Sequence, residues 1–331
     1  MLTRRAAALC AVCALASASG VRAQIQPLAV WGTGPNDVWA VGATLEPLHF
    51  SGTSWEKVPL GGTDLGALYA VWGSGPADVF VGGEIAGAGA ILRWDGRAWT
   101  DVPLPMPFFA TSLALRGDEV LVAGYVNPDE APGSDRTPGV LARLRAGRWS
   151  LSGWTRQGVT DPAVASAQWE RVLAAGDTIY LWGTLPDGKT PIVVSSGGAW
   201  TQLPTPEGEV QSFAIALAFL TGDRSLLALL SGGVGYGRLA EGRWSLVRPP
   251  DRYSPPPGMS PDELLRQTLA WSEVEDARAA WGPSAGDFFL LTRAGRIVHV
   301  QGGSPAIVYD ATCADPDIAA RSPICRMLRR P

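Results

Sequence analysis

The stretch VWGSGPADVFVGG at residues 71–83 has a near copy, VWGTGPNDVWAVG, at residues 30–42. The two copies lie 41 residues apart, measured from Trp31 to Trp72. A self-match at a period of this size indicates a repeat architecture, in which neighbouring repeats bury faces that a single repeat leaves exposed. The fold of the chain therefore follows from the structure of one repeat.

Each copy predicts a tight hairpin between two strands. In Gly-Pro-x-Asp, glycine permits a positive φ, proline fixes φ, and aspartate can bond the neighbouring backbone. The apolar runs that follow, residues 38–41 and 79–81, do not alternate, as expected of a strand buried on both faces. A second hairpin follows in each repeat, with its turn at Ser51-Gly52 or Asp95-Gly96. Four short strands in one 41-residue period are the content of one β-propeller blade.

Both hairpins recur along the chain. The first turn contains an aspartate in each repeat, at Asp37, Asp78, Asp118, Asp177, Asp223 and Asp287. The second turn is followed by a tryptophan in five repeats, at Trp55, Trp99, Trp149, Trp200 and Trp244. We expect these tryptophans to pack blades together rather than to stack on sugars. We predict an all-β fold, a six-bladed β-propeller of four-stranded antiparallel blades. Seven blades, with a degenerate unit near the termini, is the alternative, and whether residues 25–28 pair with the last blade to close the ring is open.

Several of these features resemble known propeller repeats. The Gly82-Gly83 pair, followed by Trp94 and Trp99, resembles kelch repeats, and the hairpin at residues 94–99 resembles the Asp-box turn. The VWG[ST]GPxDV[WF] signature is similar to the repeats of exported bacterial propeller proteins. The resemblance implies a propeller but no particular ligand. The repeats also depart from it, because the unit is shorter than a kelch unit and most blades lack the double glycine.

The N-terminal residues 1–23 have the pattern of a signal peptide. Arg4 and Arg5 precede an apolar run, and Val21-Arg22-Ala23 is a small-x-small cleavage site. We therefore expect an exported protein, periplasmic, extracellular or on the cell surface, whose residues 24–312 form a single propeller domain. Residues 313–331 would form a tail, in which Cys313 and Cys325 are expected to form a disulfide.

Composition narrows the classes of function. Removal of the signal peptide takes away three arginines and no acid, which leaves 24 basic and 31 acidic residues and a net charge of −7. This balance argues against non-specific nucleic-acid binding. No other run approaches the roughly 18 apolar residues of a membrane span. Motifs of serine hydrolases, phosphate-binding loops and zinc proteases do not occur. We therefore predict no catalytic residue, no metal and no cofactor, and we expect a monomer.

The only two histidines are His49 and His299. Both fall in the third strand of a blade, just before its turn, where Arg93 and Arg143 stand in other blades. We interpret them as variants of one structural position rather than as metal ligands or catalytic groups. The acidic loop at residues 127–138 does not show the spacing of calcium ligands, and we interpret it as a solvated loop.

Long insertions occur in only two kinds of connection. Residues 125–139, 153–168 and 249–276 all join the second strand to the third or the fourth strand to the next blade. Insertions gathered on one face of a repeat protein often mark its binding face. Aromatic and arginine side chains in the insertions are the candidate binding residues, because these types dominate interface hot spots. They are Trp154, Arg156, Trp169, Arg252, Tyr253 and Trp271.

The third insertion also predicts a short helix. Ser260 is a good N-cap, Pro261 suits the first helical position, and two acids follow in the first turn. Its apolar stripe would consist of Leu264, Leu265 and Leu269.

The leading hypothesis for function is an exported, non-enzymatic binding or scaffold module. Its partner would be an unidentified exported protein or a polysaccharide, bound on the face with the long insertions. The alternatives are a propeller glycosidase or lyase that acts on polysaccharide, and an assembly factor for a membrane complex. An enzyme should bring carboxylates or arginines together on this face, whereas a binding module should present an aromatic or apolar patch.

Overall fold

The computed structural model describes residues 27–34, 36–43, 46–60, 66–127, 137–204, 215–231, 235–240, 242–249, 257–274, 276–294 and 296–310. The expected signal peptide and disulfide, most of the acidic loop, and the candidate residues Arg252 and Tyr253 lie outside these residues.

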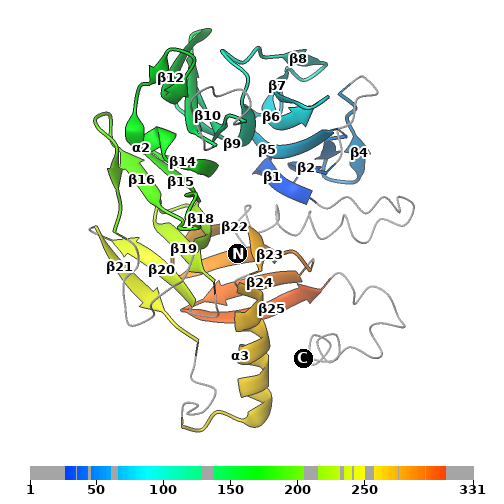
Figure 1. Ribbon diagram of the computed structural model, residues 1–331. Coiled ribbons are helices and arrows are strands. Elements are labelled where there is room, and N and C mark those ends of the chain that lie inside the picture. Colours follow the sequence, from blue (N-terminus) through cyan, green and yellow to red (C-terminus); the bar gives the residue numbers. More distant parts are fainter. Residues whose placement is uncertain are drawn as a thin grey trace. The chain divides into compact units, whose positions relative to one another are not determined.

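The described residues form six antiparallel sheets, each built from strands that are consecutive in the sequence (Figure 1). Five sheets have four strands, and the third has a fifth short strand at its outer end. The prediction of a six-bladed β-propeller with four-stranded blades is therefore confirmed. Pro27 opens the first strand of blade 1 and pairs with Gly42 in that same blade. We name the four strands of each blade A to D in chain order.

The chain divides into two compact units, and the first contains the described residues up to Leu203. Blade 1 comprises β1 Pro27–Gly34, β2 Asp37–Gly42, β3 Leu48–Phe50 and β4 Trp55–Lys57. Blade 2 comprises β5 Gly66–Gly75, β6 Asp78–Ile85, β7 Ala88–Trp94 and β8 Trp99–Asp101. Blade 3 comprises β9 Phe109–Arg116, β10 Glu119–Tyr125, β11 Gly139–Arg145 and β12 Arg148–Thr155, followed by β13 Gly158–Val159 and α2 Pro162–Ala165. Blade 4 comprises β14 Gln168–Ala175, β15 Thr178–Thr184, β16 Ile192–Ser195 and β17 Thr201–Gln202.

The second unit contains the described residues from Pro204 onward. Blade 5 comprises β18 Ile215–Leu220, β19 Leu226–Leu230, β20 Gly235–Ala240 and β21 Arg243–Val247. The helix α3 Pro261–Val274 follows, and blade 6 comprises β22 Ala277–Ser284, β23 Asp287–Thr292, β24 Arg296–Gln301 and β25 Ser304–Asp310.

Every A strand contains one extra residue at an equivalent position. In blades 1 and 2 this residue lies three positions before Trp31 and Trp72, respectively. At each of these bulges the pairing with strand B skips one residue of strand A. The bulged residues are Leu28, Tyr69, Thr111, Glu170, Ala216 and Arg278. A bulge turns a side chain out of the regular pleat, so this position of the repeat can carry any residue without disturbing the ladder.

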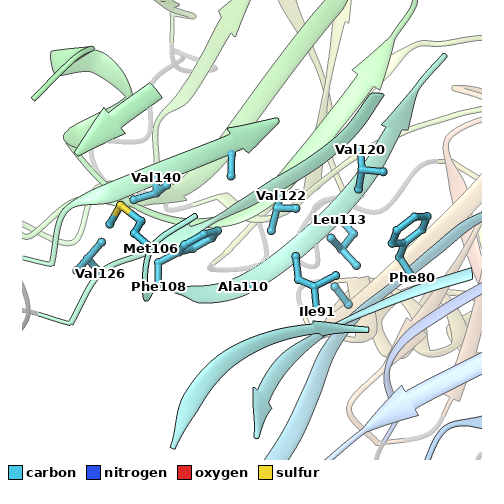
Figure 2. Packing of buried hydrophobic residues seen from close by; sticks show 12 residues of the cluster. Phe80, Ile91, Met106, Phe108, Ala110, Leu113, Val120, Val122, Val126 and Val140 are labelled. Atoms are coloured by element: carbon cyan, nitrogen blue, oxygen red, sulfur yellow. The ribbon is translucent and has the colours of Figure 1, made fainter. Parts of the chain in front are cut away.

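Adjacent blades of the first unit pack through continuous apolar layers. Figure 2 shows the layer between blades 2 and 3, where Phe80 and Ile91 lie with Ala110, Leu113 and Val122. The A strands of blades 1 to 4 lie next to one another in chain order. Because strand B of blades 2 and 3 is covered by a neighbour on both faces, its run of apolar residues does not alternate.

Tryptophans at the start of strand D connect neighbouring blades. For three of them the indole N–H donates to a backbone carbonyl one or two residues after an earlier strand D. In the first unit these bonds join Trp99 to Val58 (3.3 Å) and Trp149 to Pro103 (2.9 Å), and in the second unit Trp244 bonds Pro204 (2.6 Å). The ring of Trp99 also lies 5.7 Å from that of Trp39 in the preceding blade, measured between centroids. For Trp99 and Trp149, the prediction that these tryptophans pack blades together is therefore confirmed.

The helix α3 begins as predicted and packs differently from the prediction. Ser260 accepts a bond from the Glu263 amide (3.2 Å), which is the N-cap contact. Of the predicted stripe, Leu265 is 54% exposed. Burial is concentrated instead in the last turns, at Ala270, Trp271, Glu273 and Val274, because only that end of the helix packs on blade 6.

Candidate functional site

Two edges of the blades differ in their connections. The A–B and C–D turns form the short-turn edge, and the B–C and D–A connections form the long-connection edge. All three insertions identified in the sequence fall on the long-connection edge of their own blade, since they join β10 to β11, β12 to β14, and β21 to β22. Each edge has its own set of charged groups.

On the short-turn edge, the turn aspartate of blade 1 is fully engaged. The Thr33 hydroxyl donates to Asp37 (2.5 Å), and His49 Nε2 donates to the other oxygen of the same carboxylate (2.7 Å). The imidazole of His49 stacks on Trp39, its direct cross-strand partner, with ring centroids 4.4 Å apart. A carboxylate, an imidazole and an indole ring thus support one another within a single blade.

Blades 2 and 6 repeat this arrangement. In blade 2, Arg93 donates to Asp78 through Nε (2.7 Å) and lies over the ring of Phe80, 5.6 Å from its centroid. In blade 6, His299 donates to Asp287 (2.7 Å) and stacks on Phe289 with centroids 4.2 Å apart. The interpretation of the histidines as variants of one structural position is confirmed, because His49, Arg93 and His299 share register and partners; Arg143 shares only the register, opposite Leu121.

Four of the six candidate binding residues are described, and burial separates them. Trp169 is fully buried, and its indole N–H donates to the carbonyl of Val164 in α2 (2.6 Å). Trp271 is 5% exposed and stacks on Tyr236. Neither ring offers a surface to a partner in this conformation. Trp154 is half-buried against the layer of Figure 2, and Arg156 is exposed in the β12–β13 turn.

A group of residues outside this set lies at the long-connection edge of blades 2 to 4, where the A strands begin and the B strands end. Tyr69 and Glu170 are the bulged residues of β5 and β14, Glu84 is next to last in β6, and Tyr125 ends β10. We call Tyr69, Glu84, Tyr125 and Glu170 the rim cluster. Phe109 begins β9 and lies against Tyr125, with ring centroids 5.5 Å apart.

The pKa values of the two tyrosines respond to other groups of the rim cluster. Burial raises the pKa of Tyr69, and the negative charge of Glu84 raises it further. Burial likewise raises the pKa of Tyr125, and smaller effects of Tyr69, Glu84 and Glu170 act in the same direction. Groups of blades 2 and 4 therefore act on the hydroxyl of Tyr125 in blade 3.

The two carboxylates of the rim cluster differ in their partners. Glu170 is exposed and accepts a bond from the Thr184 hydroxyl (2.8 Å). Its charge also acts on the neighbouring Arg171, whose pKa is lowered by burial and raised again by Glu170. Glu84 is half-buried and, among the described residues, has neither a hydrogen-bond nor an ion-pair partner for its side chain.

Sequence reasoning missed the rim cluster because its members do not form a motif. A bulge is invisible in a single repeat and becomes evident only when the pairing registers of the blades are compared. The available signal was Glu84, a lone charge that directly follows Gly82-Gly83 at the end of a buried strand and next to a B–C connection.

Two further properties bear on function. Within the described segments, there is no group of three or more His, Cys, Asp or Glu side chains that could hold a metal ion. Among the helices of those segments, none is long and apolar enough to cross a membrane.

The sequence matches neither a protein-family model nor a curated protein. Solved structures of similar fold include YCF48 bound to a D1 peptide, with a TM-score of 0.56 and 15% identity over 87% of this chain and 82% of that one. YCF48 from Cyanidioschyzon merolae gives a TM-score of 0.54 with 14% identity over 87% and 86% of the two chains. A puromycin hydrolase gives 0.54 with 14% identity over 90% of this chain but only 48% of its own. At these identities the likeness shows the fold alone, and the fold of this chain is that of a β-propeller.

Proposed function

We propose that this protein is an exported, non-enzymatic binding module that holds a partner protein on the long-connection edge of blades 2 to 4. The observation that carries the proposal is the contrast between the edges. On the short-turn edge of blades 1 and 2, Asp37 and Asp78 each bind a side chain of their own blade, His49 and Arg93. At the long-connection edge, Glu84 has no partner among the described residues and lies beside aromatic rings. Aromatic side chains are enriched at protein interfaces, and a carboxylate that has no partner among the described residues is available to a basic group of a partner.

The structural comparison supports the proposal in a general way. YCF48, a protein of similar fold, has been solved with a bound D1 peptide. A protein of similar fold can therefore bind a peptide. The signal-peptide pattern of residues 1–23 is the reason to place the partner in an exported compartment.

One observation favours a second candidate, a glycosidase or lyase that acts on polysaccharide. Glu84 and Glu170 are two carboxylates in one cluster, and paired carboxylates are the usual machinery of glycoside cleavage. The Glu170 carboxylate is occupied by Thr184 and acts on Arg171, which suits it to a structural or binding role. A panel of polysaccharides tests this candidate. Release of reducing ends by the wild type, and its loss in both Glu84→Gln and Glu170→Gln, would establish the enzyme instead.

Site-specific photo-cross-linking in the native host tests the proposed function. A photoreactive amino acid replaces Val159, which is 54% exposed at the long-connection edge of blade 3. The matched control replaces Arg97, which is exposed in the C–D turn of blade 2. We expect one defined protein to be cross-linked from position 159 and not from position 97. Cross-linking from position 97 alone, or from neither position, would contradict the proposal.

A further inference from the structure

We propose that the rim cluster is a binding site for one basic side chain, arginine or lysine, presented by an extended segment of the partner protein. This inference rests on the proposed function and specifies the chemistry of its ligand. Three observations support it: the position of the cluster, the absence of a partner for Glu84 among the described residues, and the charges around the cluster.

Strand register places the cluster between neighbouring blades. Glu84 lies two residues after Gly82 in β6 and therefore on the same face of the strand. That face packs on blade 3, since a Cβ built at Gly82 would lie 3.4 Å from Leu113 and 3.5 Å from Ala110. On blade 3 the contacting pair Phe109 and Tyr125 lies at the same edge. Tyr125 is in phase with Leu121 and Ala123, so the pair lies on the face of blade 3 that packs on blade 4, yet its hydroxyl is near enough to Glu84 for that charge to act on it. The carboxylate thus lies at the boundary of blades 2 and 3, and the tyrosine lies at the end of the adjoining strand.

The unpaired state of Glu84 indicates a cationic ligand. A half-buried carboxylate without a partner loses hydration and gains no compensating interaction inside the described protein. A cation that reaches it would gain both a charge-assisted hydrogen bond and contact with the ring of Tyr69 or Tyr125. The blade 2 pair of Arg93 over Phe80 and against Asp78 shows the same chemistry within this chain.

The other charges near the cluster leave room for one added cation. Among the described residues, Arg171 adjoins the cluster and is acted on by the charge of Glu170. Two other arginines of blade 3, Arg116 and Arg145, pair with Glu119 and Asp118 at the short-turn edge. Counted over the described residues, Glu84 and Glu170 against Arg171 leave one negative charge in excess. A metal ion is a poorer candidate, because it requires more oxygen ligands than Glu84 and Glu170 supply.

The test compares two model peptides of glycine and serine that carry one central arginine or, as an isosteric neutral control, one citrulline. Binding to the mature protein is measured by calorimetry or by NMR titration. We expect the arginine peptide to bind at least about tenfold more tightly than the citrulline peptide, since a hydrogen bond to a charged group is worth about 1.4 kcal/mol more than one to a neutral group. Equal binding of the two peptides would overturn the inference.

Variants locate the site on the protein. Glu84→Gln keeps the size of the side chain and should weaken arginine binding about tenfold, and Tyr125→Leu should weaken it between about twofold and thirtyfold. The control Asp78→Asn removes a carboxylate from the short-turn edge of the same blade and should leave binding unchanged. The unfolding midpoint of each variant shows that it is folded. Wild-type affinity in folded Glu84→Gln would overturn the site.

The outcomes for this inference and for the proposed function are separable. If position 159 cross-links a partner while the arginine and citrulline peptides bind alike, the function stands and the basic ligand is wrong. If position 159 cross-links no protein, the proposed function itself fails.

Discussion

The short-turn edge and the long-connection edge of blade 2 carry carboxylates in opposite states. Asp78, on the short-turn edge, accepts bonds from Ser74 and Arg93 and is part of a pattern that the sequence repeats in other blades. Glu84, six residues later at the other edge, has no such bond within the described residues and no counterpart in the repeat. The comparison teaches that charge in a repeated position holds the blade together, whereas charge outside the repeat is available for a partner.

The largest expected effect on stability is at the long-connection edge of blade 6, where charged side chains connect the blade to α3. In the second unit, Arg296 bonds the fully buried carboxylate of Asp310 through Nε (2.9 Å) and also pairs with Glu273 of α3. Burial works to lower the pKa of Arg296, but its bonds to Asp310 and Glu273 outweigh burial and raise it. Arg296→Ala would remove the basic side chain that Asp310 and Glu273 share, and we expect it to lower the free energy of unfolding by about 3 kcal/mol. Chemical denaturation measures the change.

A matched control for this variant lies in the same blade. Arg293 pairs with Asp276 at 3.5 Å, and its side chain is 65% exposed. Arg293→Ala should cost less than about 1 kcal/mol. Similar losses in the two variants would show that the buried network contributes no more than a surface pair, and that α3 is not anchored by it.

The next effect concerns the bonds between blades. Trp149→Phe retains an aromatic ring but removes the N–H that donates to the Pro103 carbonyl. We expect a loss of about 1 kcal/mol in the free energy of unfolding, the usual contribution of one hydrogen bond. Trp154→Phe is the control, since no indole bond is at stake there. If both variants lose the same amount, ring size rather than the bond holds blades 2 and 3 together.

A smaller effect is expected on the short-turn edge itself. Arg93 is 51% exposed, so its pair with Asp78 is screened by solvent. Arg93→Ala should lower the free energy of unfolding by no more than about 1 kcal/mol, and added salt should reduce the difference. A loss well above this value would mean that the turn pairs carry more of the stability of the blade than their exposure allows.

The smallest effect is confined to alkaline pH. Burial and the charge of Glu84 raise the pKa of Tyr69 and Tyr125 above the ordinary value of 10.0. The unfolded chain then ionises first, so these residues make stability fall as pH rises above about 10 and have no effect below it. Glu84→Gln should lower both pKa values toward 10.0. Tyrosinate absorbance measures this, and Tyr180, whose raised pKa is due to burial alone, should not move.

The fold could be predicted from the sequence because its signals are local and repeated. A turn such as Gly-Pro-x-Asp specifies its own hairpin, and its recurrence near a 41-residue period specifies the blade. The same reasoning placed all insertions on one edge and assigned His49 and His299 to one structural position. The strands of blades 1 and 2 run two residues further than the Val-Trp-Gly pattern indicates, because Thr33 and Ser74 each form an extra bulge before the turn.

The site could be predicted much less well, because accessibility depends on packing between segments far apart in sequence. Trp169 and Trp271 stand outside the repeat, as a binding residue would, yet both are covered by neighbouring elements. The burial of Trp169 depends on α2, where the carbonyl of Val164 accepts a hydrogen bond from the indole N–H. Conversely, Tyr69 and Glu170 are brought to the rim by bulges that no single repeat shows.

The central claim is that the two edges have different roles: the short-turn edge holds each blade together, and the long-connection edge binds a partner. It is tested most directly by following the backbone amide resonances of labelled protein during titration with the arginine peptide. We expect resonance shifts at residues 67–70, 83–85, 124–126 and 169–171, and none at the turns of residues 75–78, 95–98 and 146–148. Shifts at the turns, or unchanged resonances at the rim cluster while the peptide binds, would contradict the central claim.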